Sequence, residues 1–236
     1  MSCSEEAKKL GFEWLEFRVS GVKCMDFEAL CLEDESVEYI QPCRFELMGT
    51  REEDTCLIQN PEDWERLGYI STYHFLAAKA FNAGVDIWEE ADAWNSDLEA
   101  AASIMYKEGL YGFDSEYLSN PCNSNMLLIQ SMWIDPKYRG NGLAEKMVRR
   151  AIFYPDTAYL AAVLIFPKSS WKAGRKYTES ERIAGDKKLR KLYASWGFRT
   201  CPVHEDYMYM DGEHINYDSV HPLCNWPGEA PSSFSK

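Results

Sequence analysis

The sequence predicts an α/β (α+β) protein organised around a strand–helix–strand unit. Residues 126–134, "MLLIQSMWI", and residues 158–166, "AYLAAVLIF", have the length and unbroken apolar character of buried strands. A helical pattern lies between them from about residue 142 to Tyr154, and Pro155 ends it. This order predicts two neighbouring, roughly parallel strands in one sheet.

Residues 86–108 predict one long amphipathic helix. Asp86 and Glu89 have the spacing of a capping box at its start, and Gly109 fits its end. Apolar residues recur along it at helical spacing and form one stripe: Ile87, Ala91, Trp94, Leu98, Ala102 and Met105. Such a stripe is typical of a helix that faces a core.

The residues up to about position 80 are predicted to be rich in strands. The segments "EWLEFRVS" and "YISTYHFLA" (69–77) alternate apolar and polar residues, as half-buried strands do. The segment "EDESVEYIQPCRFELMG" predicts two short strands separated at Pro42, because proline cannot donate to a sheet ladder.

A second helix is predicted after the central unit. Thr178 and Glu181 form a capping box at its start, and the helix runs to Trp196, where Gly197 ends it. "DYMYMD" at 206–211 predicts a late strand. The Pro/Ser-rich tail from about residue 220 is expected to fray.

Composition excludes several classes of protein. Hydrophobic residues make up 46% of the chain, enough for a real core, and the uncharged run "YLAAVLIF" is too short to cross a bilayer. No membrane partner is therefore expected. The N-terminus lacks the apolar segment of a secretion signal, and the eight cysteines include no CxxC pair. We therefore expect a cytoplasmic protein with reduced thiols.

Charge is distributed unevenly along the chain. The net charge is −13; residues 1–120 hold 26 acidic and 9 basic residues, whereas residues 121–236 hold 12 and 16. An acidic field repels phosphate backbones, so nucleic acid is not expected as a partner, and it attracts cations such as a protonated amine. Solubility alone explains the acidic excess equally well.

The turn "YRGNGLAEKM" at 138–147 separates the first buried strand from its helix. It lacks the Walker A spacing, and Glu145 stands where a dinucleotide fingerprint needs its third glycine. A strand that enters a helix through glycines nevertheless leaves backbone N–H groups free at a positive helix end, which favours an anion. A tight turn without a ligand explains two glycines as well.

Two motifs in order give a more specific interpretation. Arg139-x-x-Gly142-x-Ala144 matches the Gln/Arg-x-x-Gly-x-Gly/Ala acyl-CoA motif of the GNAT superfamily of N-acetyltransferases. Downstream, "LRKLYASWGF" resembles the family's "LYxxxGF" helix end, with Tyr193, Gly197 and Phe198 in place. The resemblance covers about residues 126–211.

The resemblance implies a mixed central sheet with helices on both faces, splayed between two central strands. It implies acetyl-CoA as cosubstrate. Backbone groups near Met132 and Ile134 would pair with the pantetheine arm like an added strand. The turn would hold the pyrophosphate through the amides of Arg139, Gly140, Asn141, Gly142, Leu143 and Ala144.

The domain organisation follows from this resemblance. Residues 1–236 are expected to form a single GNAT-like domain. Residues 1–125 would supply acceptor-side elements, 126–211 the acyl-CoA-binding core, and 212–236 a C-terminal tail.

The implied reaction is direct transfer of an acetyl group to a primary amine, with Tyr193 as the general acid. A phenol with a pKa of roughly 10 is protonated at neutral pH and can donate, although an aromatic at a helix end can also serve packing alone. An amine that titrates at roughly 10.4 must also lose a proton. The strand before the turn offers Gln130, which can position a water but cannot abstract a proton; Asp114, Glu116 and His74 are further candidates for the base.

Several alternatives stay open. Because that strand carries no carboxylate, the chain could be a catalytically weak or inactive module that binds acyl-CoA or a partner. The acceptor could be a small molecule, a protein lysine or a protein N-terminus. Asp186 replaces the family's usual Asn seven residues before the tyrosine, so its contact with pantetheine is less predictable.

Two further clusters have both a functional and an ordinary explanation. Basic residues at 168–176 either contact the 3′-phosphate of CoA or form a solvated loop: Lys168, Lys172, Arg175 and Lys176. A CxxH…HxxC pattern has the residue types of a tetrahedral zinc site, although its order is uncommon: Cys201, His204, His221 and Cys224.

Overall fold

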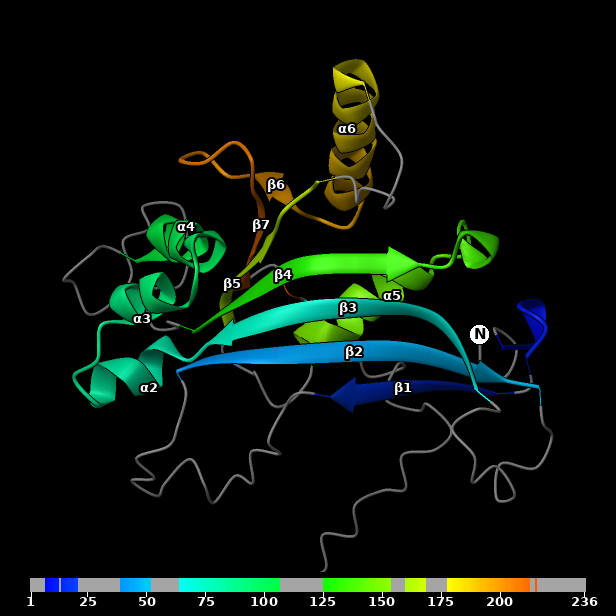
Figure 1. Ribbon diagram of the computed structural model, residues 1–236, viewed down its shortest axis with the longest axis horizontal. Helices are drawn as coiled ribbons and strands as arrows, with labels where there is room; N and C mark the ends of the chain where they lie inside the picture. Colours follow the sequence, from blue (N-terminus) through cyan, green and yellow to red (C-terminus); the bar gives the residue numbers. More distant parts are fainter. Residues whose placement is uncertain are drawn as a thin grey trace, which may run out of the picture.

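A computed structural model describes residues 7–12, 14–20, 39–51, 64–106, 125–153, 160–168, 178–212 and 215. Its centre is a seven-stranded sheet with the order β1-β2-β3-β4-β5-β7-β6 (Figure 1). The strands are β1 (Trp14–Ser20), β2 (Ile40–Thr50), β3 (Glu65–Phe75), β4 (Asn125–Ile134), β5 (Leu160–Ile165), β6 (Arg199–Thr200) and β7 (Met208–Asp211). The helices are α2 (Ala77–Asn82), α3 (Ile87–Trp94), α4 (Ser96–Met105), α5 (Leu143–Ile152) and α6 (Glu179–Ser195), with a 3₁₀ turn, η3 (Pro136–Tyr138).

The sheet is mixed. Strands β1 to β4 form an antiparallel meander, β4 and β5 are parallel neighbours joined through α5, and β5, β7 and β6 are again antiparallel. The predicted strand–helix–strand unit is therefore confirmed, as is the mixed α/β sheet with flanking helices.

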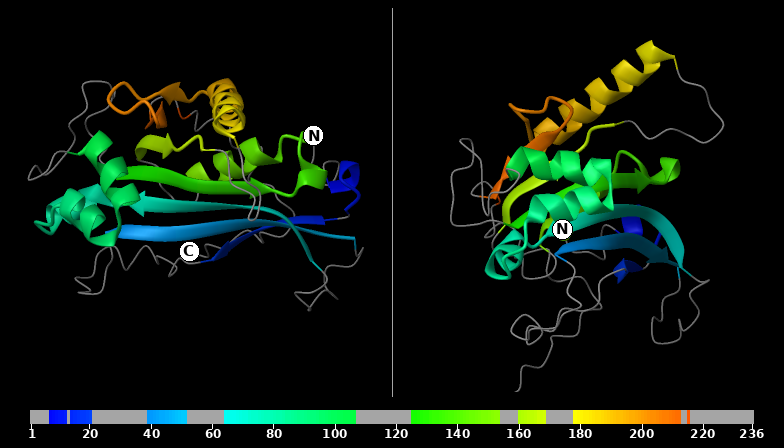
Figure 2. Two further views of the ribbon diagram at one scale, coloured as in Figure 1. Left: turned by 45° about the horizontal axis from the view of Figure 1, so that its top comes forward. Right: turned by 60° about the vertical axis from the view of Figure 1, so that its left-hand side comes forward.

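Helices cover both faces of the sheet (Figure 2). On one face, α2, α3 and α4 share a core with Phe75, Met126 and Leu164. On the other face, α5 and the end of α6 share a core with Leu127, Ile129 and other residues of the same strands. Helix α6 otherwise stands away from the sheet, and of its residues Tyr193 alone is buried (Figure 1). No helix among the described residues is long and apolar enough to cross a membrane.

Strands β4 and β5 separate halfway along β4. Their pairing ends at Ile129 and Ile165, whereas β4 stays paired with β3 as far as Ile134. Figure 1 shows β5 turning away from β4 beyond this point. The predicted splay between two central strands is thus present, and it leaves the last part of β4 with an open edge, meaning one that no described strand pairs with.

The predicted helix at 86–108 is wrong in one respect, because two helices occupy this segment. Asn95 ends α3 and begins α4 with an extended backbone (φ −175°, ψ 164°), and its side chain accepts hydrogen bonds from the amides of Asp97 and Leu98. The cap satisfies donors that a continuous helix would pair internally. As a result Trp94 leaves the predicted stripe and is 40% exposed. Asp86 caps α3 as predicted by accepting from the amide of Trp88.

The predicted break at Pro42 is also wrong, because β2 runs without interruption through it. The pairing of β1 with β2 begins at Arg44, so Pro42 lies where β2 has β3 on one side and no described strand on the other. A proline is tolerated at such an unpaired position. Strand β3 also begins earlier than predicted and ends at Phe75, and residue Ala77 already belongs to α2.

The remaining predicted elements are mostly confirmed. Helix α6 begins at the predicted capping box of Thr178 and Glu181, and β7 falls within the predicted 206–211. Asp114, Glu116, Lys172, Arg175, Lys176, His221 and Cys224, the stop at Gly109 and the tail from residue 216 lie outside the described residues.

Candidate functional site

Beyond Ile129, the edge of β4 that faces β5 has backbone groups that no described strand pairs with. The amide of Asp135 donates to the carbonyl oxygen of Leu67 in β3 at 2.8 Å. Because backbone groups alternate sides along a strand, those of Ile134 and Met132 face away from β3, toward the gap left by β5. The two residues predicted to bind an extended ligand therefore lie on this edge. An exposed edge of this kind can pair with an added extended chain.

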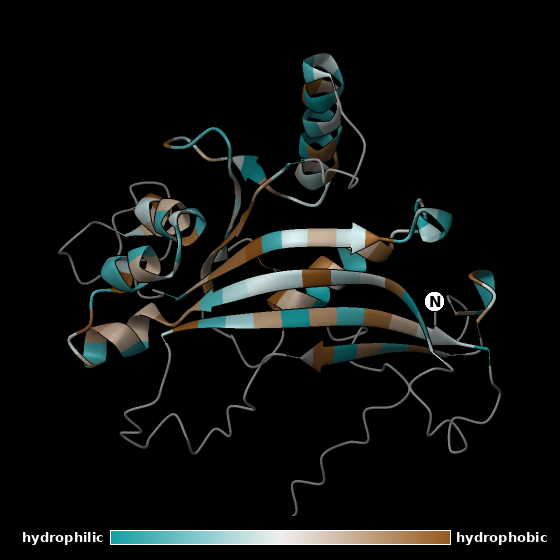
Figure 3. Cartoon of the chain, viewed as in Figure 1, coloured by the Kyte–Doolittle hydropathy of each residue, from teal (hydrophilic) through white to brown (hydrophobic). Residues whose placement is uncertain are grey.

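A β-bulge lies where the edge opens. Ser71 and Thr72 of β3 pair with Ser131 and Ile129, which leaves Gln130 as the extra residue of β4. Gln130 and Ser131 are exposed although β4 is in the middle of the sheet, and Figure 3 shows a hydrophilic interruption in an otherwise apolar strand. Bulges next to functional sites re-aim side chains. Gln130, a predicted site residue, is therefore accessible at the split.

The turn after β4 requires its two glycines for conformational reasons. Gly140 has φ 81° and Gly142 has φ 74°, a region that other residues adopt only with strain. A Cβ atom added at either glycine would meet no atom within 4 Å. The space in front of the turn is thus open, and packing does not explain the glycines.

Five backbone amides of the turn have no hydrogen-bond acceptor among the described residues. Within the described residues, no acceptor is present for the N–H groups of the following residues: Gly140, Asn141, Gly142, Leu143 and Ala144. The first turn of a ten-residue helix, α5, adds a positive dipole end to them. The one carboxylate there, Glu145, is paired with Arg149 at 2.7 Å. The turn therefore has the donors and the local potential of an anion site.

Arg139 differs from the other residues of the predicted set. Its amide donates to the carbonyl oxygen of Pro136 at 3.4 Å, and its side-chain Nε donates to the carbonyl oxygen of Ile134 at 2.9 Å. The side chain of Asn141 similarly donates to the carbonyl oxygen of Tyr138 at 3.0 Å. These bonds fold the turn back onto the end of β4. Arg139 thus braces the turn, and the free amides begin at Gly140.

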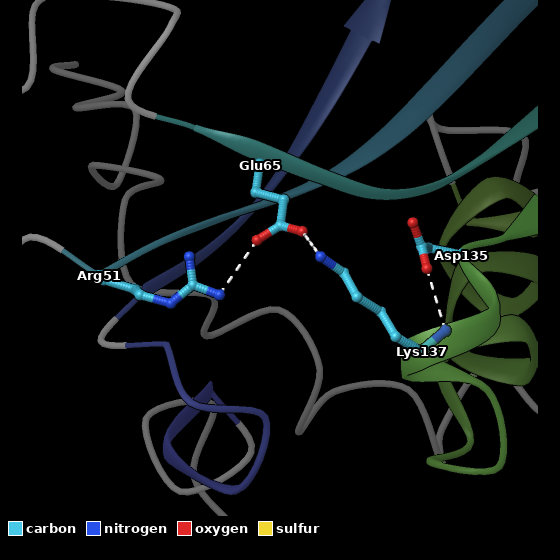
Figure 4. Close-up of polar contacts among 4 residues, drawn as sticks. All are labelled: Arg51, Glu65, Asp135 and Lys137. Atoms are coloured by element: carbon cyan, nitrogen blue, oxygen red, sulfur yellow. Dashed lines mark hydrogen bonds and ion pairs between the residues drawn. The ribbon is translucent and has the colours of Figure 1, made fainter.

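A polar network anchors the turn to β3 (Figure 4). Glu65, at the start of β3, accepts from the ammonium of Lys137 and from Arg51 Nη2 at 3.1 Å. Asp135 caps η3 by accepting from the amide of Lys137 at 3.0 Å. The hydrogen bond from Lys137, together with others from Tyr138 and Arg51, lowers the pKa of Glu65. Since these side chains are largely solvated, the network fixes geometry more than it adds stability.

Tyr193 lies at the C-terminal end of α6, in the core that also contains Ile129 and Ile165, the last paired residues of β4 and β5. Its ring packs against Trp196 and Phe198, with centroids 5.2 and 6.3 Å away. Burial raises its pKa to about 12. The hydroxyl has no hydrogen-bond partner within the described residues, and its raised pKa keeps it protonated at neutral pH.

Of the candidates for a base, His74 is the one the structure describes. It is buried in β3, where it pairs with Leu127, and burial lowers its pKa to about 4. Its Nε2 atom has no partner within the described residues. His74 is therefore a neutral core histidine at physiological pH.

Sequence reasoning missed a pocket of about 380 Å³ beside α5. It lies between the outer side of α5, at Val148 and Arg149, and the segment that follows α6, at Trp196 and Gly197. The glycine has φ 101° and lets the chain turn back from the helix to β6. The "SWGF" sequence was the signal for this corner, but a pocket depends on how α6 docks.

The metal hypothesis concerns residues that the structure describes only in part. Cys201 is buried and its amide donates to the carbonyl oxygen of Tyr207, while the ring of His204 lies edge-on against Tyr207. No group of three or more potential metal ligands occurs among the described residues. Since His221 and Cys224 lie outside them, the four-residue zinc site stays a prediction.

Comparison with known proteins finds similar solved structures but no matching family model or curated protein. The solved structures that are similar include a KacTA–DNA complex (12% identity, 88% of this chain and 99% of that chain, TM-score 0.38). They also include AtaTR with acetyl-CoA (11%, 85% and 95%, 0.38) and AtaT with acetyl-methionyl-tRNAfMet (13%, 89% and 99%, 0.35). Each of these structures shares at most 13% sequence identity with this chain.

Proposed function

We propose that this chain is an acyl-CoA-dependent N-acetyltransferase of the GNAT type that transfers acetyl from acetyl-CoA to a primary amine. One observation carries the proposal. The end of β4, which has no described strand on one edge, leads through η3 into a glycine turn whose amides have no acceptor among the described residues, and these features coincide with the Arg139-x-x-Gly142-x-Ala144 motif. A nucleotide linked to a pantetheine thioester matches these two features in this order: its extended arm can pair with the strand edge, and its pyrophosphate can bind at the anion site.

Residues of β4 and of the glycine turn would bind different parts of acetyl-CoA. Backbone groups of Met132 and Ile134 would pair with the amides of the pantetheine arm. The amides from Gly140 to Ala144 would hold the pyrophosphate, since they have no acceptor among the described residues and lie at a helix N-terminus. Arg139 would keep the strand end and the turn in register through its bond to the carbonyl oxygen of Ile134.

The chemistry then takes place where β4 and β5 separate. The amine nitrogen attacks the thioester carbonyl carbon, the carbon–sulfur bond breaks, and the sulfur leaves as a thiolate that is protonated. The proton released by the amine passes to solvent through water positioned by Gln130, which cannot itself accept it. The bulge that exposes Gln130 supplies the access for this water.

Tyr193 is the proposed general acid, and its raised pKa decides how it acts. A phenol with a pKa of about 12 is a weaker acid than a thiol at roughly 8.5, so complete transfer of its proton to a thiolate costs roughly 5 kcal/mol. A hydrogen bond to the developing thiolate carries no such cost. We therefore expect Tyr193 to stabilise the leaving sulfur first, with solvent supplying the final proton.

The test is acetylation of a panel of primary amines, followed by release of the CoA thiol and by mass spectrometry of the products. The proposal predicts acetylated product that depends on both the amine and acetyl-CoA. No binding of acetyl-CoA would contradict it.

A second candidate is a module that binds acyl-CoA without turnover. It is favoured by the absence of a carboxylate from β4 and by the neutral, buried state of His74. Tight binding of acetyl-CoA together with no acetylation of any amine in the panel would support this alternative over the enzyme.

A further inference from the structure

Three side chains form a ladder across β2, β3 and β4 on the sheet face opposite α5. The guanidinium carbon of Arg44 lies 3.9 Å from the ring centroid of Tyr69, and Tyr69 stacks on Trp133 with centroids 6.0 Å apart and planes inclined by 24°. Their chain neighbours Phe45, Ile70 and Ile134 belong to the core beneath α5. Because side chains alternate along strands, the ladder lies on the other face.

The ladder is braced from the β2 side. Glu46 accepts from Arg44 Nε at 3.3 Å and from Arg66 Nη1 at 3.0 Å, so both arginines are held around Tyr69. Arg44 thereby occupies the ring face of Tyr69 that points toward β2. Tyr69 and Trp133 pair directly across β3 and β4, which places Trp133 on the opposite ring face.

The helices of this face leave the ladder uncovered. The core shared by α2, α3 and α4 contains Phe75, Met126 and Leu128, which lie at the far end of β3 and β4. The ladder lies at the other end, where Tyr69 and Trp133 are half-buried and Ser131 is exposed. The part of the sheet face that no described helix covers therefore adjoins the split between β4 and β5.

Trp133 ends the ladder at the open edge of β4. One face of its indole contacts Tyr69, and β5 does not continue alongside β4 at this position. No further ring or cation stacks on Trp133 within the described residues. Ser131 lies two positions away on the same face of β4, roughly 7 Å along the strand, and the exposed Gln130 follows.

We propose that Trp133 is a specificity-determining residue that stacks on a planar aromatic ring of the acyl acceptor. The acceptor class is then a primary amine joined to an aryl group by a short alkyl arm, which spans the distance from Trp133 to Ser131 and Gln130. We expect the aryl ring of the acceptor, and not its amine, to stack on Trp133. A cation over an indole is stabilised in its charged form, whereas the attacking amine must lose its proton.

This inference rests on the proposed function, because it identifies the acceptor of the same site. The experiment compares 2-phenylethylamine with 2-cyclohexylethylamine, which has a similar size and charge but no π face. Binding of each amine to the full-length protein is measured by calorimetry, with and without CoA. The expected preference for the phenyl compound is about three- to tenfold, the range that an aromatic pair provides.

Variants separate stacking from general hydrophobic contact. In Trp133→Leu the ratio of the Kd values for the two amines should fall to about one. In Trp133→Phe most of the preference for the phenyl compound should remain. The matched control is Trp94→Leu, since Trp94 is another tryptophan whose ring packs against a tyrosine, Tyr73, but it lies on α3. Trp94→Leu should leave the preference unchanged.

Equal affinities for the two amines in the wild-type protein would overturn the proposal, even if Trp133→Leu failed to fold. An unchanged preference in folded Trp133→Leu would overturn it as well. A separate titration with acetyl-CoA keeps the two ideas distinct. If acetyl-CoA does not bind but the phenyl preference depends on Trp133, the proposed function fails and the aromatic subsite stands.

Discussion

At the scale of single residues, burial determines the chemistry of the tyrosine and the histidine near the split. Tyr193 keeps its proton because its pKa is raised to about 12, and His74 stays neutral because its pKa is lowered to about 4. The first group is a lasting donor and the second is an uncharged core residue. Their effects on activity and on stability therefore differ and can be measured separately.

Replacing Tyr193 by phenylalanine should lower kcat by about 10²-fold, because losing a positioned hydrogen-bond donor to developing negative charge typically costs about 10²- to 10³-fold. The Kd for acetyl-CoA should stay nearly unchanged, since the proposed contacts lie on β4 and the turn. Tyr207→Phe is the control: burial also raises the pKa of Tyr207 to about 12, but its hydroxyl donates to the carbonyl oxygen of Asp97 on the other face. Equal kcat in wild type and Tyr193→Phe would exclude the catalytic role.

Because burial lowers the pKa of His74, we predict that acid lowers the free energy of unfolding. Its folded pKa of about 4 lies below the unfolded value of 6.5, so the unfolded chain binds the proton first as the pH falls. The free energy of unfolding should therefore decrease between about pH 6.5 and pH 4, by up to roughly 3 kcal/mol. Urea unfolding at several pH values measures this, and His74→Leu should remove most of the dependence. A variant with the same pH dependence as wild type would contradict this origin.

At the scale of elements, the region from β4 to β5 was predictable because its signals are local. Apolar runs, a glycine turn and a helical pattern follow one another between Met126 and Phe166. The start of α6 likewise follows from the capping box at Thr178. The split between β4 and β5 was expected from the family resemblance alone, because the point where pairing ends depends on the path of β5.

The wrong predictions at residues 86–108 and at Pro42, and the bulge that was not predicted, also have specific causes. The stretch "WNSD" contains its own cap at Asn95, and this local signal overrides the apolar stripe across it. Pro42 is compatible with a strand because β1 ends before reaching it, a non-local fact. The bulge at Gln130 had a signal in the polar pair inside "MLLIQSMWI", but its geometry depends on pairing with β3.

The side-chain cap at Asn95 should contribute measurably to the free energy of unfolding at the junction of α3 and α4. Asn95→Ala removes a side chain that accepts from the amides of Asp97 and Leu98, so the free energy of unfolding should fall by about 1 kcal/mol. Asn82→Ala is the control, because Asn82 is an exposed residue at the end of α2. Chemical denaturation measures both variants, and equal effects would show that the cap contributes little.

At the scale of the whole molecule, the sheet divides the proposed site between its two faces. The turn and α5 offer an anion site, while the ladder that ends at Trp133 lies on the opposite face, and both adjoin the opening between β4 and β5. An amine held at the ladder would approach the thioester from the side away from α5. The acidic character of the chain would favour the approach of a protonated amine.

Two glycines allow a matched test of the anion site. Gly142 and Gly84 have nearly the same φ, 74° and 72°, and a Cβ at either meets no atom within 4 Å. Gly84 precedes α3, away from the turn after β4. Glutamate at either position thus imposes similar backbone strain, but only Gly142→Glu places a carboxylate at the proposed pyrophosphate site.

The decisive measurement is calorimetric titration of acetyl-CoA into the wild-type protein, Gly142→Glu and Gly84→Glu. We predict that wild type and Gly84→Glu bind with similar Kd, and that Gly142→Glu binds at least about tenfold more weakly, because a new anion faces the pyrophosphate. Absence of binding to the wild-type protein, or an unchanged Kd in folded Gly142→Glu, would contradict an acyl-CoA site at this turn.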